Sequence, residues 1–111
     1  MKTFTINNNT QYANVSTMRQ LINLNKNNGY HFFDKGSMKW FNSRIHSDIY
    51  GGCVFVTSER RGWDRPREYT VRIVHANGSI ETCSSLGQYS SRYQAHEAAK
   101  HLVQHGYLTV I

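Results

Sequence analysis

The chain has 111 residues, with 13 lysines and arginines against 7 aspartates and glutamates, which gives a formal net charge of +6. This length fits one domain, residues 1–111, and the basic excess is compatible with an anionic partner. The sequence has no apolar run long enough to cross a bilayer and no signal-peptide pattern, which argues against a membrane partner and predicts a cytoplasmic protein. Two cysteines, Cys53 and Cys83, are too few for a disulfide framework, so we expect reduced, buried thiols.

The N-terminal part of the chain carries weak patterns. Residues 2–6 predict a short edge strand, and an apolar stripe over residues 15–22 predicts a helix that begins after Asn14 or Ser16 and stops at an Asn-Asn-Gly turn. This patterning leaves open whether residues 1–28 belong to the core or pack as a loose appendage.

Short elements and one longer strand follow. The aromatic run at residues 30–33 predicts a strand, and Ser37 is predicted to cap a short helix that includes Phe41. The apolar run at residues 53–58 lacks clean alternation, so we expect a central strand that is covered on both faces.

The connection after this strand, residues 59–67, concentrates basic and aromatic side chains. Guanidinium groups pair with phosphate through two parallel hydrogen bonds, and an exposed indole can stack on a base or wedge into a groove. The alternative for Trp63 is that its ring folds back over Pro66 or an arginine side chain and closes the rim of the core. Lys39 and Arg44 extend the same positive surface. The predicted binding residues are Arg60, Arg61, Trp63, Arg65, Arg67, Arg72, Lys39 and Arg44.

A β-hairpin is predicted at Asn77-Gly78, because this pair accepts the positive φ angles of a two-residue type I′ turn. Counting outward from that turn places Ile73 opposite Thr82. Since side chains alternate between the faces of a strand, one apolar face carries Tyr69, Val71, Ile73, Ile80 and Leu86. The other face, expected to meet solvent or a partner, carries Thr70, Arg72, Val74, Glu81, Cys83 and Ser85.

An amphipathic helix follows the hairpin. Ser91 and Gln94 form a capping box, and Gly106 is typical of a helix C-terminus. The apolar stripe of this helix consists of Ala95, Ala98, Ala99, Leu102 and Val103. Residues 107–111 predict a terminal strand. The expected fold class is α+β: an antiparallel sheet of three or more strands, with its hairpin at Asn77-Gly78, packed against the C-terminal helix, with one or two short N-terminal helices.

Catalytic and metal-binding signatures are missing from the sequence. His96 and His101 resemble an HExxH zinc-protease pair, but their spacing places them roughly 140° apart around a helix, so they cannot chelate one zinc ion. His101 and His105 share a helix face without a third ligand nearby. We therefore predict no catalytic residues, no metal site and no cofactor, and a non-enzymatic protein that acts by binding.

The order of strands and helix over residues 52–105, with GQYSS leading into an Ala-x-x-Ala-Ala helix, resembles two groups of nucleic-acid-binding domains. One group is the DNA-binding domains of phage and transposon integrases and of plant AP2 factors. The other is the last half of double-stranded RNA-binding domains. The resemblance implies contact through the sheet, or through the helix start and a strand loop. This chain departs from both patterns, because the hairpin face offers Arg72 but few other basic groups and the helix start offers only Arg92.

A second resemblance rests on the segments YHFFDKGSMKWFNSRI (30–45), VFVTSE (54–59) and REYTVR (67–72). They are similar to a family of small proteins encoded by bacteriophages and related mobile elements. The resemblance implies an accessory protein in a bacterial cytoplasm, where inhibitors of host defence such as anti-CRISPR proteins are common. It assigns no functional residue.

These patterns support different classes of binding function. In the first hypothesis the protein binds nucleic acid or a nucleoprotein through the basic, tryptophan-containing loop. In the alternative it inhibits a host defence system by direct protein contact, with Trp40, Trp63 and Tyr93 as anchors. An exposed sheet edge would also permit a homodimer.

Overall fold

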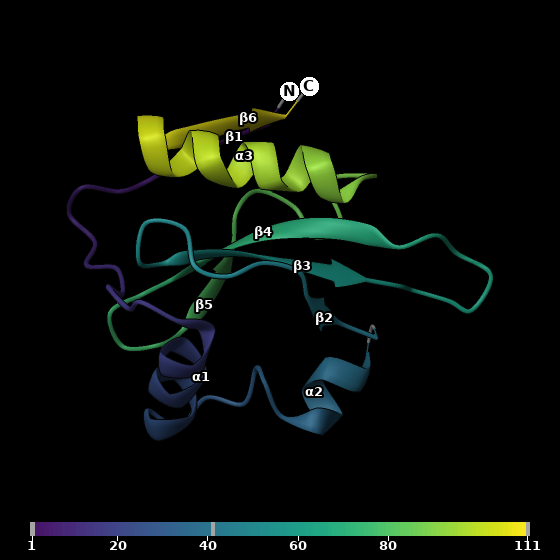
Figure 1. Ribbon diagram of the computed structural model, residues 1–111, viewed down its shortest axis with the longest axis horizontal. Helices are drawn as coiled ribbons and strands as arrows, with labels where there is room; N and C mark the ends of the chain where they lie inside the picture. The colour runs from purple at the N-terminus through teal and green to yellow at the C-terminus, as the bar shows by residue number, and fades with distance from the viewer. Residues whose placement is uncertain (1, 41, 111) are drawn as a thin grey trace.

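The structure is a computed structural model that describes residues 2–40 and 42–110 (Figure 1). In chain order the elements are β1 (Lys2–Thr5), α1 (Met18–Asn27), α2 (Lys35–Trp40), β2 (Arg44–Ile45), β3 (Val54–Glu59), β4 (Glu68–Val74), β5 (Ile80–Thr82), α3 (Arg92–His105) and β6 (Tyr107–Val110). The antiparallel sheet has the order β2-β3-β4-β5, so the predicted α+β class is confirmed. Phe41 and Ile111, which the sequence-based predictions include, lie outside the described residues.

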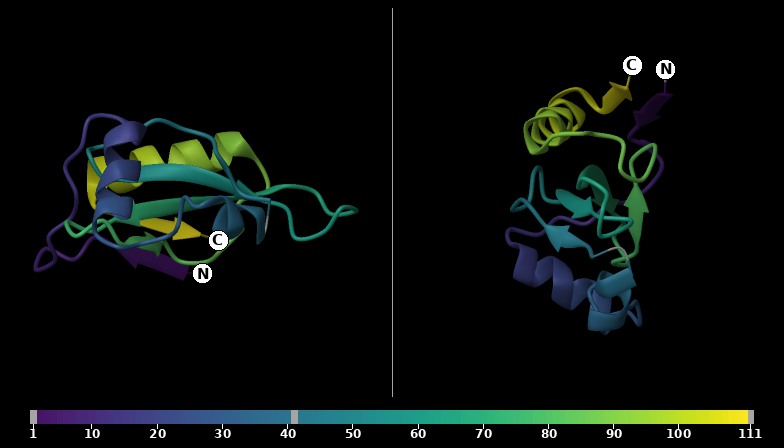
Figure 2. Two further views of the ribbon diagram at one scale, coloured as in Figure 1. Left: turned by 90° about the horizontal axis from the view of Figure 1, so that it is seen from below. Right: turned by 90° about the vertical axis from the view of Figure 1, so that its right-hand side faces the viewer.

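The four-stranded sheet forms the middle layer of the molecule. Figures 1 and 2 show α3 and the two-stranded β1–β6 ribbon on one side of it, and α1 and α2 on the other. The second sheet face was expected to meet solvent or a partner, and that expectation is wrong. The face is covered because Leu21 of α1, together with Phe32 and Phe33 from the connection that follows, packs against it.

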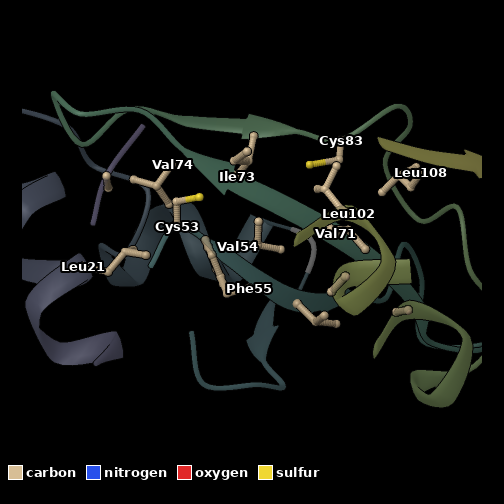
Figure 3. Close-up of a cluster of buried hydrophobic side chains, with 14 residues drawn as sticks. Leu21, Cys53, Val54, Phe55, Val71, Ile73, Val74, Cys83, Leu102 and Leu108 are labelled. Atoms are coloured by element: carbon tan, nitrogen blue, oxygen red, sulfur yellow. The ribbon is translucent and has the colours of Figure 1, made fainter. Parts of the chain in front are cut away.

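Buried side chains gather on both faces of this sheet (Figure 3). Leu21 lies near Phe55 on one face, and Leu102 of α3 lies over Val71 on the other. Every residue of β3 is buried, which confirms the prediction of a central strand covered on both sides. The N-terminal segment adds Ala13 to the same core.

The two cysteines are free thiols, and both are buried. This confirms the prediction of reduced, buried cysteines. Burial raises the pKa of the thiol of Cys53 and, more strongly, that of Cys83. Both side chains are therefore held in the protonated, weakly nucleophilic form.

The turn at Asn77-Gly78 is present, but it closes a longer loop than the sequence predicts. His75 donates its backbone N–H to the carbonyl of Ser79 at 2.9 Å, and Gly78 donates to the carbonyl of His75 at 2.8 Å. Gly78 has a φ of +89°. These bonds define a three-residue loop that ends in a left-handed glycine, which is the other common hairpin connection containing glycine.

The longer loop shifts the predicted strand pairing by one residue. Arg72 lies opposite Thr82, and Val74 lies opposite Ile80. Ile80 therefore shares a face with Arg72 rather than with the apolar residues of the predicted set. Because side chains alternate along a strand, this shift moves every β5 side chain to the other face.

Both longer helices have side-chain caps. Ser91 accepts a hydrogen bond from the backbone N–H of Gln94 at 3.2 Å, and Gly106 ends α3 with a φ of +81°. The side chain of Gln94 accepts from Ser90 instead of reaching back to Ser91, so half of the predicted capping box forms. Thr17 caps α1, one residue after Ser16 and three after Asn14, the two predicted positions.

The segment 30–33 was predicted to be a strand, and this is wrong. Both edges of β3 are already occupied, by β2 and β4, and the segment instead forms a turn that places two rings on the sheet. The ring centroids of Phe32 and Phe33 lie 6.3 and 6.0 Å from that of Phe55. The short helix that follows begins before Ser37, which lies inside α2.

Within the described residues, the structure contains no helix that combines the length and apolar character needed to span a bilayer.

Gly78→Ala should lower the free energy of unfolding more than Gly29→Ala does. Both glycines have positive φ, so each alanine costs about 1–2 kcal/mol in backbone strain. A Cβ at Gly78 would also lie 2.8 Å from the carbonyl oxygen of Leu24 in α1, whereas a Cβ at Gly29 meets nothing within 4 Å. Urea denaturation of both variants measures the difference. Equal losses would contradict the packing of α1 against the hairpin.

Candidate functional site

The loop between β3 and β4 projects beyond the sheet (Figure 2, left). It is braced by its own arginines. Arg60 donates from Nε to the carbonyl of Arg65 at 2.9 Å and from Nη2 to the carbonyl of Trp63. Arg61 donates from Nη2 to the carbonyl of Leu86 at 3.0 Å, which ties the loop to the segment after β5. The loop therefore has a defined shape despite its exposure.

A cleft of about 350 Å³ separates this loop from the end of α2. Two indole rings stand on it, and Trp40 and Trp63 are 79% and 88% exposed. The high exposure of Trp63 contradicts the alternative in which its ring folds back over the core. We call this site the basic cleft, and its lining is Lys39, Trp40, Asn42, Arg60, Arg61, Gly62 and Trp63. That described lining includes basic side chains but no carboxylate.

Arg67 supports the basic cleft from behind. It is half-buried, and it donates from Nε to the hydroxyl of Ser58 at 2.8 Å and from Nη2 to the carbonyl of Asn42. Burial and the nearby charge of Arg44 both lower its pKa from the ordinary value. Because Asn42 lines the cleft, Arg67 holds one wall in place.

A second positive cluster surrounds His46. Burial lowers the pKa of His46 from its ordinary value of 6.5, and the charges of Arg67, Arg92 and Arg44 lower it further. These arginines come from the end of the β3–β4 loop, from α3 and from β2. Arg44 itself is exposed, so this cluster continues the positive surface along the edge strand.

Arg72 is 8% exposed and makes its contacts inside the protein. Its Nε lies 3.2 Å from the hydroxyl of Thr57, its Nη1 donates to Thr82, and its Nη2 lies 3.4 Å from Oε2 of Glu59. The guanidinium carbon lies 5.3 Å from the ring centroid of Phe32. Burial lowers the pKa of Arg72, and the charge of Glu59 partly opposes this shift.

Arg72 also lies in the lining of a larger pocket, of about 590 Å³. This pocket lies between α2 and the sheet. Phe32, Met38, Trp40 and Leu86 supply most of its apolar surface. Since Trp40 lines the basic cleft as well, the two hollows share one wall.

Four predicted binding residues line the basic cleft, namely Lys39, Arg60, Arg61 and Trp63. The other four are placed elsewhere. Arg65 is exposed on the same loop but outside the cleft lining, and Arg44 and Arg67 lie beside His46. Arg72 is buried rather than exposed on an open sheet face, because α2 and its preceding connection cover that face.

The sequence placed Trp40 beside Trp63 as an anchor for a protein partner, but it did not assign Trp40 to the nucleic-acid site and did not reveal the pocket over Arg72. A tryptophan beside a lysine in a short, weakly patterned helix was the one available signal for Trp40. The pocket has no local signal, because its lining comes from separate parts of the chain.

The histidines of α3 do not extend this site. The ring centroids of His101 and His105 lie 4.5 Å apart. Across the described part of the chain, no three histidine, cysteine or acidic side chains are grouped so that they could hold a metal ion.

A family model described as "Family of unknown function (DUF7447)" matches residues 4–100. The searches of curated proteins and of solved structures returned no match.

His46 should make folding less favourable as the pH falls. Its pKa in the folded protein lies below 6.5, so the unfolded chain takes up the proton first and stability is lost as the pH falls below about 6.5. The loss levels off once the pH passes the folded-state pKa. His46→Gln should therefore lose less unfolding free energy than the wild type between pH 7.5 and 5. Urea denaturation across this range measures the difference, and equal losses would rule out His46 as the cause.

Arg72→Met should destabilise the protein by about 3–5 kcal/mol, because it leaves the buried carboxylate of Glu59 without its counter-charge. The double variant Glu59→Leu with Arg72→Met removes both charges and should recover most of that loss. The free energy of unfolding of each variant is the measurement. If the double variant is no more stable than Arg72→Met, the loss of stability does not come from the unpaired charge of Glu59.

Proposed function

The chain belongs to the DUF7447 family, whose function is unknown, and from its own surface we propose that it binds single-stranded nucleic acid in the basic cleft. One observation carries the proposal. Two highly exposed indoles, Trp40 and Trp63, stand on a cleft whose other described lining includes Lys39, Arg60 and Arg61. A single exposed ring is common on protein surfaces, whereas large apolar side chains gathered on one cleft mark an interaction site.

The charged part of the cleft suits a phosphate backbone. Arg60 uses Nε and Nη2 to brace the loop, and Arg61 uses Nη2. Each guanidinium retains further N–H groups, and Lys39 adds an ammonium group. Phosphate contacts of this kind supply most of the affinity in non-specific nucleic-acid binding. The net charge of +6 favours approach to a polyanion as well.

The aromatic part of the cleft favours an unpaired strand over a duplex. The faces of bases are available for stacking only where the strand is unpaired, and stacking on an aromatic ring contributes about 1–3 kcal/mol per base. Trp63 projects from the loop tip, and Trp40 stands at the end of α2. A strand can therefore place bases on the rings while its phosphates contact Lys39 and the arginines.

This function suits a small accessory protein of a bacteriophage or mobile element acting in a bacterial cytoplasm. Such a protein can bind nucleic acid directly or act on a nucleoprotein. The proposal requires no catalytic group and no cofactor.

Trp63→Ala should weaken binding of a labelled single strand of about 12 nucleotides by about 5- to 150-fold. The ring is 88% exposed, so its removal should leave the fold intact. Tyr93→Ala is the matched control, since Tyr93 is 74% exposed on α3, outside the cleft lining. Fluorescence anisotropy at about 50 mM salt measures both. If the two variants weaken binding equally, the strand does not bind in the basic cleft.

The plot of log affinity against log salt has a negative slope. Lys39→Ala should reduce the magnitude of that slope by about 0.7 to 1, as expected for one lost phosphate contact. Lys26→Ala, which removes an exposed lysine of α1, should leave the slope unchanged. Titrations between about 50 and 200 mM salt give both slopes. If single-stranded nucleic acid does not bind at micromolar protein, the proposal fails. If a duplex does not bind either, the remaining alternative is a protein partner anchored by the same indoles.

A further inference from the structure

We propose that the pocket over Arg72 is a guanine site, which a strand held in the basic cleft enters with one unpaired base. The inference rests on the proposed function for the strand, whereas the pocket itself can be tested with free nucleosides. Its volume of about 590 Å³ falls within the range of ordinary small-molecule pockets. Trp40 lines both hollows, so a base in the pocket and phosphates in the cleft can belong to one strand.

The guanidinium of Arg72 has donors to spare. An arginine carries five N–H groups. In the described part of the chain, Nε and Nη1 donate to the hydroxyls of Thr57 and Thr82, and Nη2 forms an ion pair with Oε2 of Glu59 at 3.4 Å. One N–H on Nη1 and one on Nη2 remain. Two adjacent donors of this kind are suited to a ligand with two adjacent acceptors.

The charge of the pocket floor selects among such ligands. Glu59 already provides the counter-charge of Arg72, since its Oε2 lies 3.4 Å from Nη2. A carboxylate or phosphate ligand would bring a second anion close to this buried carboxylate, at a cost in repulsion. A neutral acceptor pair carries no such cost. The floor therefore favours an uncharged ligand edge over an anionic one.

Guanine supplies that edge. Its O6 and N7 accept together from one arginine, whereas adenine presents an acceptor beside an amino donor. The pocket walls suit a flat heterocycle, because Phe32, Met38, Trp40 and Leu86 form apolar surfaces around the polar floor. Phe32 also lies against the guanidinium, with its ring centroid 5.3 Å from the guanidinium carbon, and holds the fork in one orientation.

The first test varies the base. In a thymine strand of about 12 nucleotides with one central purine, guanine should bind about 5- to 150-fold more tightly than adenine. Hypoxanthine keeps O6 and N7 and should bind like guanine, whereas 7-deazaguanine lacks N7 and should bind like adenine. Equal affinity for all four strands would overturn the guanine site and leave the proposed function standing.

The second test blocks the pocket. Gly36 belongs to the lining, and a Cβ built on it meets nothing within 4 Å, so Gly36→Phe has room to place its ring at the pocket without a collision at its Cβ. Gly36→Ala is the matched control, because it also replaces the glycine with a better helix former and adds little volume. Gly36→Phe should abolish the preference for guanine, and Gly36→Ala should retain it. Retention of the preference in both variants would place guanine recognition elsewhere and overturn the inference.

The third test separates the two proposals. Free guanosine should quench tryptophan fluorescence in the wild type and in Gly36→Ala but not in Gly36→Phe, and free 7-deazaguanosine should bind at least 5-fold more weakly. If guanosine binds in this way and no strand does, the pocket stands and the proposed function falls. If strands bind and guanosine leaves the fluorescence of every variant unchanged, the guanine site falls.

Discussion

A single buried guanidinium constrains the centre of this protein. Moving a charge out of water costs several kcal/mol unless partners replace the water around it. Arg72 obtains those partners from both neighbouring strands, through Thr57 and Glu59 of β3 and Thr82 of β5, and from Phe32 above the sheet. The strand order, the register and the cover of α2 must all be correct for this set to form. The same residue prevents that face from closing as a purely apolar core, which leaves a pocket with a polar floor.

Local signals predicted the elements whose ends are determined by nearby residues. Ser91 and Gly106 bound α3 as their residue types indicate. The glycine at position 78 predicted a hairpin, but glycine serves loops of two and of three residues, and nothing local distinguishes them. Because of this ambiguity, the predicted pairing of β4 with β5 is shifted by one residue, and the predicted faces of β5 are reversed. Phe32 was misassigned because its contacts lie on β3, more than twenty positions away in the sequence.

The residues of the candidate site likewise fall into two groups: those that local sequence predicts, and those whose role depends on packing between distant parts of the chain. Trp63 and the arginines beside it could be predicted, since a charged loop between two strands has few ways to bury a large ring. The contribution of Trp40 depends on where α2 lies against the sheet, and the patterns around α2 are too short to determine that position. Arg72 looked like a surface residue because strand alternation identifies the two faces of a sheet but does not say what covers each of them.

The bracing of the β3–β4 loop has a kinetic consequence. Because Arg60 already holds the carbonyls of Trp63 and Arg65, the loop's conformational entropy is lost during folding and not on contact with a ligand. A preformed surface needs no slow rearrangement before it captures a partner, so association can approach the rate of electrostatically steered diffusion. Under the proposed function, differences in affinity among strands would then arise from how long each one stays bound.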